Sequence, residues 1–210
     1  MAERETMGPT AGSDPGRRER KRQQLLDHLA DTAWALFDAA GFDAVTMEAI
    51  AAAADLSKVT LYRYFPVKEA LLRHVFHREL RAAWPAIRAD LERLAPGRAR
   101  LGRFLDLQAA WCERHRAVLA PYIRFRLGDP RLPAEDRMRS GMDAIFAELI
   151  AQGQSAGAFR TDLPAPLLAM HFQFAHLATV LRCLADNRLA LADELAAMLD
   201  LFCNGMGVRG

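Results

Sequence analysis

The sequence is poor in the features that mark secreted, disulfide-bonded or membrane-embedded proteins. It contains only three cysteines, Cys112, Cys183 and Cys203, which lie far apart and form no CxxC pair. Their number and spacing do not predict a disulfide framework. No apolar stretch typical of a signal peptide precedes Leu25, and no apolar run approaches the ~18 residues that a membrane-spanning helix needs. We therefore expect a cytoplasmic protein with no membrane partner.

The chain also lacks an excess of charge of either sign. Its 28 Lys and Arg residues nearly balance 26 Asp and Glu residues, and only Lys21, Lys58 and Lys68 are lysines. A nearly neutral protein has no overall field that draws it to nucleic acid or to anionic membranes, so any such binding depends on local placement of charge. With 51% hydrophobic residues in 210, the chain can build a substantial core.

Strand patterns are missing as well, because no segment alternates apolar and polar residues for long enough. We predict an all-α fold of about nine helices. Residues 1–16, rich in glycine and proline, are predicted to be a disordered tail. Pro85 should kink the fourth helix or break it in two. The predicted helices cover residues 25–40, 46–55, 57–65, 68–84 with a continuation to 94, 100–115, 117–127, 134–153, 164–186 and 189–205.

Two short helices near the N-terminus are separated by very few residues. Thr46 and Ser57 are suited to cap their N-termini, and Gly41 is placed to end the helix before them. A tight turn forces a steep crossing, for which the four alanines at 51–54 leave room. Pro66 stops the second of the two helices. This pattern predicts a helix-turn-helix.

The segment 46–71, TMEAIAAAADLSKVTLYRYFPVKEAL, resembles the DNA-binding signature of the tetracycline-repressor (TetR) family. The detailed resemblance covers about residues 22–75, and the helix layout is similar beyond it. Asp55 and Val59 depart from the family pattern, since glycine is common at both, although aspartate tolerates the left-handed region. Val67 replaces a capping serine, which should cost about 1 kcal/mol. The resemblance implies a DNA-binding transcriptional regulator rather than an enzyme.

The helix at 57–65 is expected to enter the major groove of DNA. Arg63 could bond a guanine bidentately, and the methyl groups of Val59 and Thr60 could touch a thymine methyl. Tyr62, Tyr64 and Lys68 are expected at phosphates, as the resemblance also implies. The basic run at 17–22 is either a phosphate-contacting arm or a solvated helix start. The full set of predicted DNA contacts is Arg22, Thr46, Ser57, Lys58, Val59, Thr60, Tyr62, Arg63, Tyr64 and Lys68.

A single short recognition helix reads few base pairs, so we expect a homodimer on a palindromic operator. The DNA-binding domain is predicted at 17–70 and a ligand-binding and dimerisation domain at 71–210. The last two helices are apolar on more than one face, which predicts a partner subunit on one of them; the alternative is a monomer core. The predicted interface residues are Leu168, Phe172, Thr179, Leu195, Met198 and Phe202.

Aromatic and soft side chains in the second domain predict either an ordinary core or a cavity for a small lipophilic effector. The candidate lining residues are Trp84, Phe104, Trp111, His115, Tyr122, Phe125, Met170, His171 and Phe174. A ligand that favours the form unable to bind DNA would release the operator, as expected of a ligand-responsive repressor. The fourth helix would couple the two sites, with Pro85 as its hinge.

Two other functions compete with this one. An enzyme is disfavoured because there is no nucleophile elbow, Gly-rich phosphate loop or paired-carboxylate signature. The pairs His74 with His77 and Cys112 with His115 lack a third ligand, so no metal and no cofactor are expected. A non-specific architectural DNA protein is disfavoured by the near-neutral charge.

Overall fold

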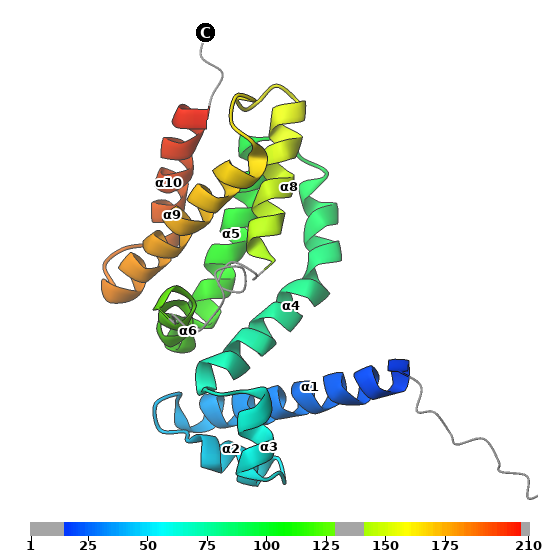
Figure 1. The fold of residues 1–210 in the computed structure, drawn as a ribbon. Coiled ribbons are helices and arrows are strands. Elements are labelled where there is room, and N and C mark those ends of the chain that lie inside the picture. The colour runs from blue at the N-terminus through cyan, green and yellow to red at the C-terminus, as the bar shows by residue number, and fades with distance from the viewer. Residues whose placement is uncertain (1–14, 129–140, 207–210) are drawn as a thin grey trace, which may run out of the picture.

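The computed structural model describes residues 15–128 and 141–206, and every regular element in these two ranges is a helix (Figure 1). The predicted all-α fold is confirmed. The helices, labelled as in Figure 1, are α1 Pro15–Ala40, α2 Met47–Ala53, α3 Lys58–Tyr64, α4 Lys68–Leu91, α5 Arg98–Arg114, α6 Arg116–Gly128, α8 Met142–Ser155, α9 Ala165–Ala185 and α10 Leu191–Met206.

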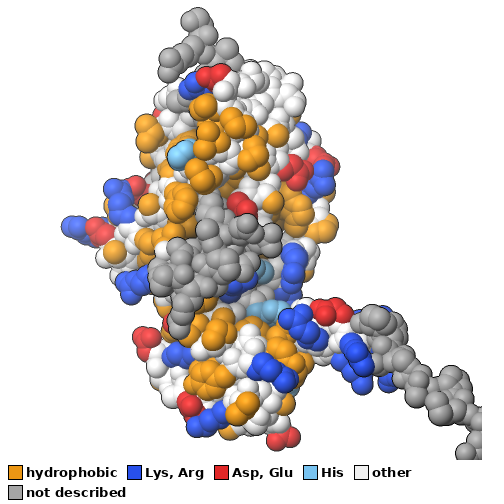
Figure 2. All heavy atoms as spheres, viewed as in Figure 1, with side chains coloured by type: hydrophobic (Ala, Val, Ile, Leu, Met, Phe, Trp, Pro, Cys, Tyr) orange, Lys and Arg blue, Asp and Glu red, His pale blue; other side chains and the backbone are white. Residues whose placement is uncertain are grey.

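The first helix begins ten residues earlier than its apolar pattern predicts. α1 starts at Pro15, so the basic run at 17–22 lies on the helix itself. Arg, Lys, Glu and Gln are good helix formers, and they prolong α1 without adding apolar contacts. This charged end projects away from the rest of the molecule (Figures 1 and 2). Residues 1–14 of the predicted tail and residues 129–140, which include the start of the helix predicted at 134, lie outside the described residues.

The fourth helix is not broken at Pro85. α4 continues from Lys68 to Leu91 with the proline inside it, and it changes direction along its length (Figure 1). Proline removes one backbone hydrogen bond and crowds the preceding turn, which favours a bend over termination when neighbours hold both halves. One continuous helix therefore joins the N-terminal helices to the rest of the chain.

The helices form two groups joined by α4 (Figure 1). α1, α2 and α3 make the smaller group, while α5, α6, α8, α9 and α10 make the larger one. The centre of the larger group is a chain of rings: Phe104 and Phe146 lie 5.6 Å apart between centroids, and Phe146 and Phe172 4.8 Å. All three side chains are fully buried. These edge-to-face contacts fix α5, α8 and α9 against one another.

Among the described helices, α9 alone is long and apolar enough to span a membrane by length and composition. It packs along α8 and α10 and also touches α6. A helix covered by neighbours on several sides is apolar around most of its circumference. Its place in the helical core thus accounts for its composition.

Candidate nucleic-acid interface and helical cavity

The turn between α2 and α3 is built as the sequence predicts. Thr46 accepts a hydrogen bond from the Ala49 amide at 3.1 Å, and Ser57 accepts one from the Thr60 amide at 3.2 Å. Both predicted N-caps are confirmed. Asp55 has φ of 53°, the left-handed conformation expected where glycine is common.

Small and apolar side chains hold the two helices together. Ile50 and Leu61 are fully buried, and Ala51 and Ala54 are buried beside them. Leu61 is the only buried residue within α3. The rest of α3 is consequently free to face outward, as a groove-reading helix requires.

The outward surface of α3 carries most of the residues predicted to contact DNA. Val59 is 80% exposed and Tyr62 44%, and they are the exposed large hydrophobic side chains among the described residues of α1, α2 and α3. Ser57, Lys58 and Arg63 are exposed as well, while Thr60 and Tyr64 are half-buried. A β-branched valine this exposed has no packing role, so its surface is available to a partner.

The charged groups on α3 have local partners in the protein. The Lys58 ammonium lies 3.3 Å from a Glu48 carboxylate oxygen. Arg63 donates to the Tyr64 hydroxyl at 3.0 Å, with its guanidinium 4.8 Å from the centre of that ring. Exposed pairs of this kind contribute little free energy. A phosphate or a base edge can therefore replace them.

Lys68 plays a structural part that the sequence does not reveal. Its ammonium donates to the Phe42 carbonyl oxygen at 2.7 Å and sits 4.4 Å from the centre of the Phe42 ring. The start of α4 is thus fastened to the loop before α2, and Val67 provides no side-chain cap. An ammonium has three N–H donors, so the remaining ones can still meet a phosphate. Arg22, the last predicted contact, is exposed on α1 and bonds Glu19 at 3.2 Å.

Ion pairs and hydrogen bonds join α1 to α4. His74 Nε2 lies 2.6 Å from Asp27 Oδ1, and Arg78 contacts both Asp27 and Asp31. Burial by itself would raise the pKa of Asp27, but hydrogen bonds from His74 and Gln23 together hold it below its usual value. The lower half of α4 is therefore attached to the N-terminal helices by charge as well as by packing.

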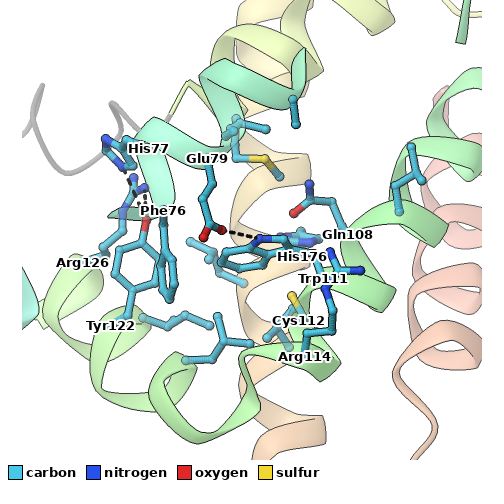
Figure 3. A pocket seen from close by; sticks show the side chains of 18 of the residues that line it. Phe76, His77, Glu79, Gln108, Trp111, Cys112, Arg114, Tyr122, Arg126 and His176 are labelled. Atoms are coloured by element: carbon cyan, nitrogen blue, oxygen red, sulfur yellow. Dashed lines mark hydrogen bonds between the residues drawn. The ribbon is translucent and has the colours of Figure 1, made fainter. Parts of the chain in front are cut away.

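A cavity of about 550 Å³ lies within the larger group of helices (Figure 3). Residues of α4, α5, α6, α8 and α9 line it. Two of the predicted lining residues, Trp111 and Tyr122, form part of its wall. Its volume falls in the range of small-molecule sites.

The other seven predicted lining residues lie outside this cavity. Phe104 is fully buried core, whereas Phe174 is 47% exposed and His171 is exposed on the outer side of α9. The rest, Trp84, His115, Phe125 and Met170, are half-buried and do not line the cavity. The sequence identifies which residues are aromatic, but helix rotation decides which of them face inward.

Several polar lining residues were missed by the sequence analysis. They are His77 and Glu79 from α4, Gln108 and Arg114 from α5, Arg126 from α6, and Gln173 and His176 from α9. The signal that could have revealed His176 is its spacing, since it lies three and four residues from Gln173 and Phe172 on one helix face.

One side of the cavity holds a cluster of hydrogen-bonding groups from α4 and α6. Arg126 donates to the Tyr122 hydroxyl at 3.2 Å, and that hydroxyl lies 3.4 Å from His77 Nε2. Burial, and then the positive charge of Arg126, lowers the pKa of His77 to about 3. His77 is therefore neutral at physiological pH.

The cavity wall is in direct contact with α1. Trp111 donates to Glu79 at 3.0 Å (Figure 3) and packs 4.6 Å from the Phe76 ring. His115 lies next to Trp111 at 4.5 Å and stacks edge-on against Trp34 of α1 at 5.3 Å. A continuous row of rings thus runs from the cavity to the first helix.

The residues predicted for a dimer interface mostly point into the protomer. Phe172 is fully buried, and Leu168, Leu195 and Met198 are buried as well. Thr179 and Phe202 are half-buried, and the Thr179 hydroxyl donates to the Ala175 carbonyl at 2.9 Å. The expectation assigned the two faces of α9 in the wrong order: the face carrying Leu168 and Phe172 covers α8 and α10. Buried side chains leave almost no area for a second subunit.

The opposite face of α9 is apolar and uncovered. Leu167 and Phe174, seven residues apart, are 37% and 47% exposed, and Leu201 of α10 is 72% exposed. Hydrophobic side chains gather on the surface over α9 and α10 in Figure 2. We call Leu167, Phe174 and Leu201 the outer apolar face.

Across residues 15–128 and 141–206, no three His, Cys, Asp or Glu side chains come together in a metal-binding group. His74 bonds Asp27, and His77 faces Tyr122.

A helix-turn-helix with an exposed second helix, joined by one long helix to a hollow helical group, defines the class of DNA-binding regulators. Residues 29–75 match the model of the family described as bacterial regulatory proteins, tetR family. The chain is 31% identical over 147 residues to the HTH-type transcriptional repressor KstR of Mycolicibacterium smegmatis, covering 68% of each protein. The chain therefore belongs to the TetR family of DNA-binding transcriptional regulators, which are not enzymes.

Solved structures share the whole architecture. FadR of Thermus thermophilus, a TetR-family repressor solved with lauroyl-CoA, superposes with a TM-score of 0.79 at 24% identity, covering 88% of this chain and 96% of that one. RolR, solved with resorcinol, gives a TM-score of 0.69 at 20% identity, covering 91% and 92%. At these identities the likeness extends to the fold alone.

Proposed function

We propose that this protein is a homodimeric repressor that binds a palindromic operator and releases it when a small apolar molecule enters the helical cavity. The observation that carries the proposal is the cavity. Part of its wall is α4, the helix that directly follows the helix-turn-helix. FadR and RolR were solved with lauroyl-CoA and resorcinol respectively, so proteins of this fold have been solved with small organic ligands.

The proposed DNA contacts are residues of α3 and its N-cap, together with residues of α1, of the N-cap of α2 and of the start of α4. Lys58, Val59, Thr60 and Arg63 are assigned to base edges. The phosphate contacts assigned are Arg22, Thr46, Ser57, Tyr62, Tyr64 and Lys68. We propose that residues 17–70 form the DNA-binding domain, that residues 71–210 form the effector-binding and dimerisation domain, and that the protein acts in the cytoplasm.

The dimer is proposed to form through the outer apolar face. Isolated exposed leucines are normal on a monomer, but Leu167, Phe174 and Leu201 are gathered on two neighbouring helices. A two-fold interface uses the same patch on both subunits, and a symmetric pair of recognition helices suits a palindromic site.

Selection of DNA from a random oligonucleotide pool at moderate salt tests the proposal. The expected product is a palindrome whose half-sites lie about one helical turn apart. Failure of the purified protein to enrich any palindrome would contradict the assignment. Competitor DNA supplies the control, since non-specific binding disappears into it and operator binding persists.

A matched pair of variants tests the dimer. Phe174→Glu should give a monomer by analytical ultracentrifugation and weaken operator binding, because a charge would be buried at the interface. Leu94→Glu, at an exposed position just beyond the end of α4, is the control and should stay dimeric. A dimeric Phe174→Glu protein would rule out this face.

A further inference from the structure

Two polar side chains of α9 face the cavity deep inside the protein. Gln173 is 2% exposed and His176 4%, and both line the cavity one helical turn apart. Among the described residues, no protein group bonds Gln173 Oε1 or either ring nitrogen of His176. The His176 ring contacts the Phe146 ring, 5.8 Å between centroids, which offers packing only.

Unpaired polar atoms at this depth need an explanation. Most buried polar groups in folded proteins have a hydrogen-bond partner, and leaving one unpaired opposes folding. Gln154 of α8 shows the usual state, because it donates to the carbonyls of Arg160 and Leu163, both at 2.8 Å. Among the described residues, Asp143 Oδ1 of α8 is the one other buried side-chain atom without a hydrogen-bond partner, but Asp143 does not line the cavity.

The α9 side of the cavity is uncharged. Burial lowers the pKa of His176 to about 4, so its ring is neutral at physiological pH, with one nitrogen as donor and the other as acceptor. The Gln173 amide carries no charge. The charged lining residues, Glu79, Arg114 and Arg126, belong to α4, α5 and α6 instead. A carboxylate or an ammonium placed beside α9 would lack a counter-charge from that helix.

A hydroxyl group fits this pair of side chains. Its hydrogen can be donated to Gln173 Oε1, and its oxygen can accept from the protonated nitrogen of His176. A carbonyl or an ether oxygen can only accept, which leaves Gln173 Oε1 unpaired. The remaining wall suits an apolar body, because it includes Leu80, Ile87, Leu107, Leu119, Ile123 and Val180.

We propose that the effector is an uncharged apolar molecule bearing a hydroxyl group, which Gln173 and His176 bind together. This inference rests on the proposed function in one respect, that the cavity is the effector site. It adds the chemical class of the ligand and the two residues that select it.

A set of probes with one apolar chain and different head groups tests the selection. The probes are 1-decanol, decyl methyl ether, decanoate and decylammonium, with affinity followed by tryptophan fluorescence, since Trp111 lines the cavity. We expect 1-decanol to bind about tenfold more tightly than each of the others, the factor expected for one lost hydrogen bond that leaves a buried group unpaired. In Gln173→Leu and His176→Leu the preference for 1-decanol over decyl methyl ether should fall to within about twofold, whereas the charged probes should stay excluded. Equal affinities in the wild type, or no saturable binding of 1-decanol, would overturn the proposal.

A ligand-free measurement separates a binding role from a structural one. Gln173→Leu removes an unpaired amide, so its melting temperature should equal or exceed that of the wild type. The matched control Gln154→Leu breaks two hydrogen bonds and should melt several degrees lower. If Gln173→Leu lost as much stability as Gln154→Leu, the amide would have a structural partner and the assignment would be wrong.

The repressor function and the hydroxyl assignment fail in different ways. If 1-decanol is preferred but the protein selects no operator, the ligand chemistry stands and the repressor function fails. If the protein binds its operator and the alcohol and the ether release it at equal concentrations, the repressor function stands and the hydroxyl assignment is overturned.

Discussion

The polar residues of α3 and those of α9 are treated in opposite ways by the fold. On α3, Lys58 and Arg63 are exposed and already paired with Glu48 and Tyr64. On α9, Gln173 and His176 are buried and have no protein partner among the described residues. A surface that meets DNA can keep its side chains in weak local pairs, because water and salt make exchange easy. A cavity that selects one small molecule keeps polar atoms without protein partners. A ligand that cannot bond to those atoms leaves them unpaired, and this cost distinguishes it from a ligand that can.

The largest effect should come from the DNA side of this contrast. Replacing Tyr62 and Lys68 together by alanine is expected to lower operator affinity by about 100-fold, since each protomer loses a tyrosine contact and a charged phosphate contact. Gel shifts at constant salt measure the loss. Probe binding in the cavity should be unchanged, and an unaltered operator affinity would exclude these residues from the interface.

The next largest effect is a pH dependence of stability that comes from the buried His176. The pKa of His176 is about 4 in the folded protein against about 6.5 when unfolded, so between these values the unfolded chain binds the additional proton. Stability should therefore fall as pH drops through this window, by about 2 kcal/mol from this residue between pH 7.5 and pH 5. Denaturant unfolding of wild type and His176→Leu at both pH values isolates the term. Equal pH dependence in the two proteins would show that His176 is accessible to protons.

The bend in α4 joins the two regions and can be tested by removing its cause. Pro85→Ala restores a backbone donor and should straighten the helix, changing the effector concentration that releases DNA by about fivefold, near 1 kcal/mol of coupling. The measurement is a gel shift titrated with 1-decanol beside a direct binding curve. Unchanged release with normal ligand affinity would remove Pro85 from the coupling path.

The smallest expected effect lies between the two regions. Val67 precedes α4 in an extended conformation with no side-chain cap, so Val67→Ser should stabilise the protein by about 0.5–1 kcal/mol. Ser57→Ala, which deletes a cap that is present, is the opposite control and should destabilise by a similar amount. Thermal unfolding measures both changes. A destabilised Val67→Ser protein would mean that the packing of the valine side chain contributes more stability than a serine cap would add.

Sequence reasoning succeeded where the physics is local. Thr46, Ser57 and Asp55 each act through backbone groups within a few residues, so their neighbours along the chain suffice to place them. Pro85 shows the limit, since its ring predicts a disturbed helix but only tertiary packing decides between a bend and a break.

The site in the larger helical group could be predicted only in part. Trp111 and Tyr122 were expected at the cavity, but Phe104 belongs to the core and Phe174 to the surface. All four are aromatic residues on amphipathic helices, and their facing depends on how far each helix is rotated against its neighbours. The inverted faces of α9 have the same origin: a helix that is apolar nearly all round does not specify which side remains uncovered.

The bond from Lys68 to the Phe42 carbonyl has a mechanical consequence. It ties the first turn of α4 to the loop that leads into α2. A tilt of α4 would therefore move α2 and α3, here called the reading head, together with it. In a dimer, effector binding would then alter the separation of the two heads and leave each head unchanged. A ligand-loaded dimer should accordingly still recognise an isolated half-site while failing on the properly spaced pair.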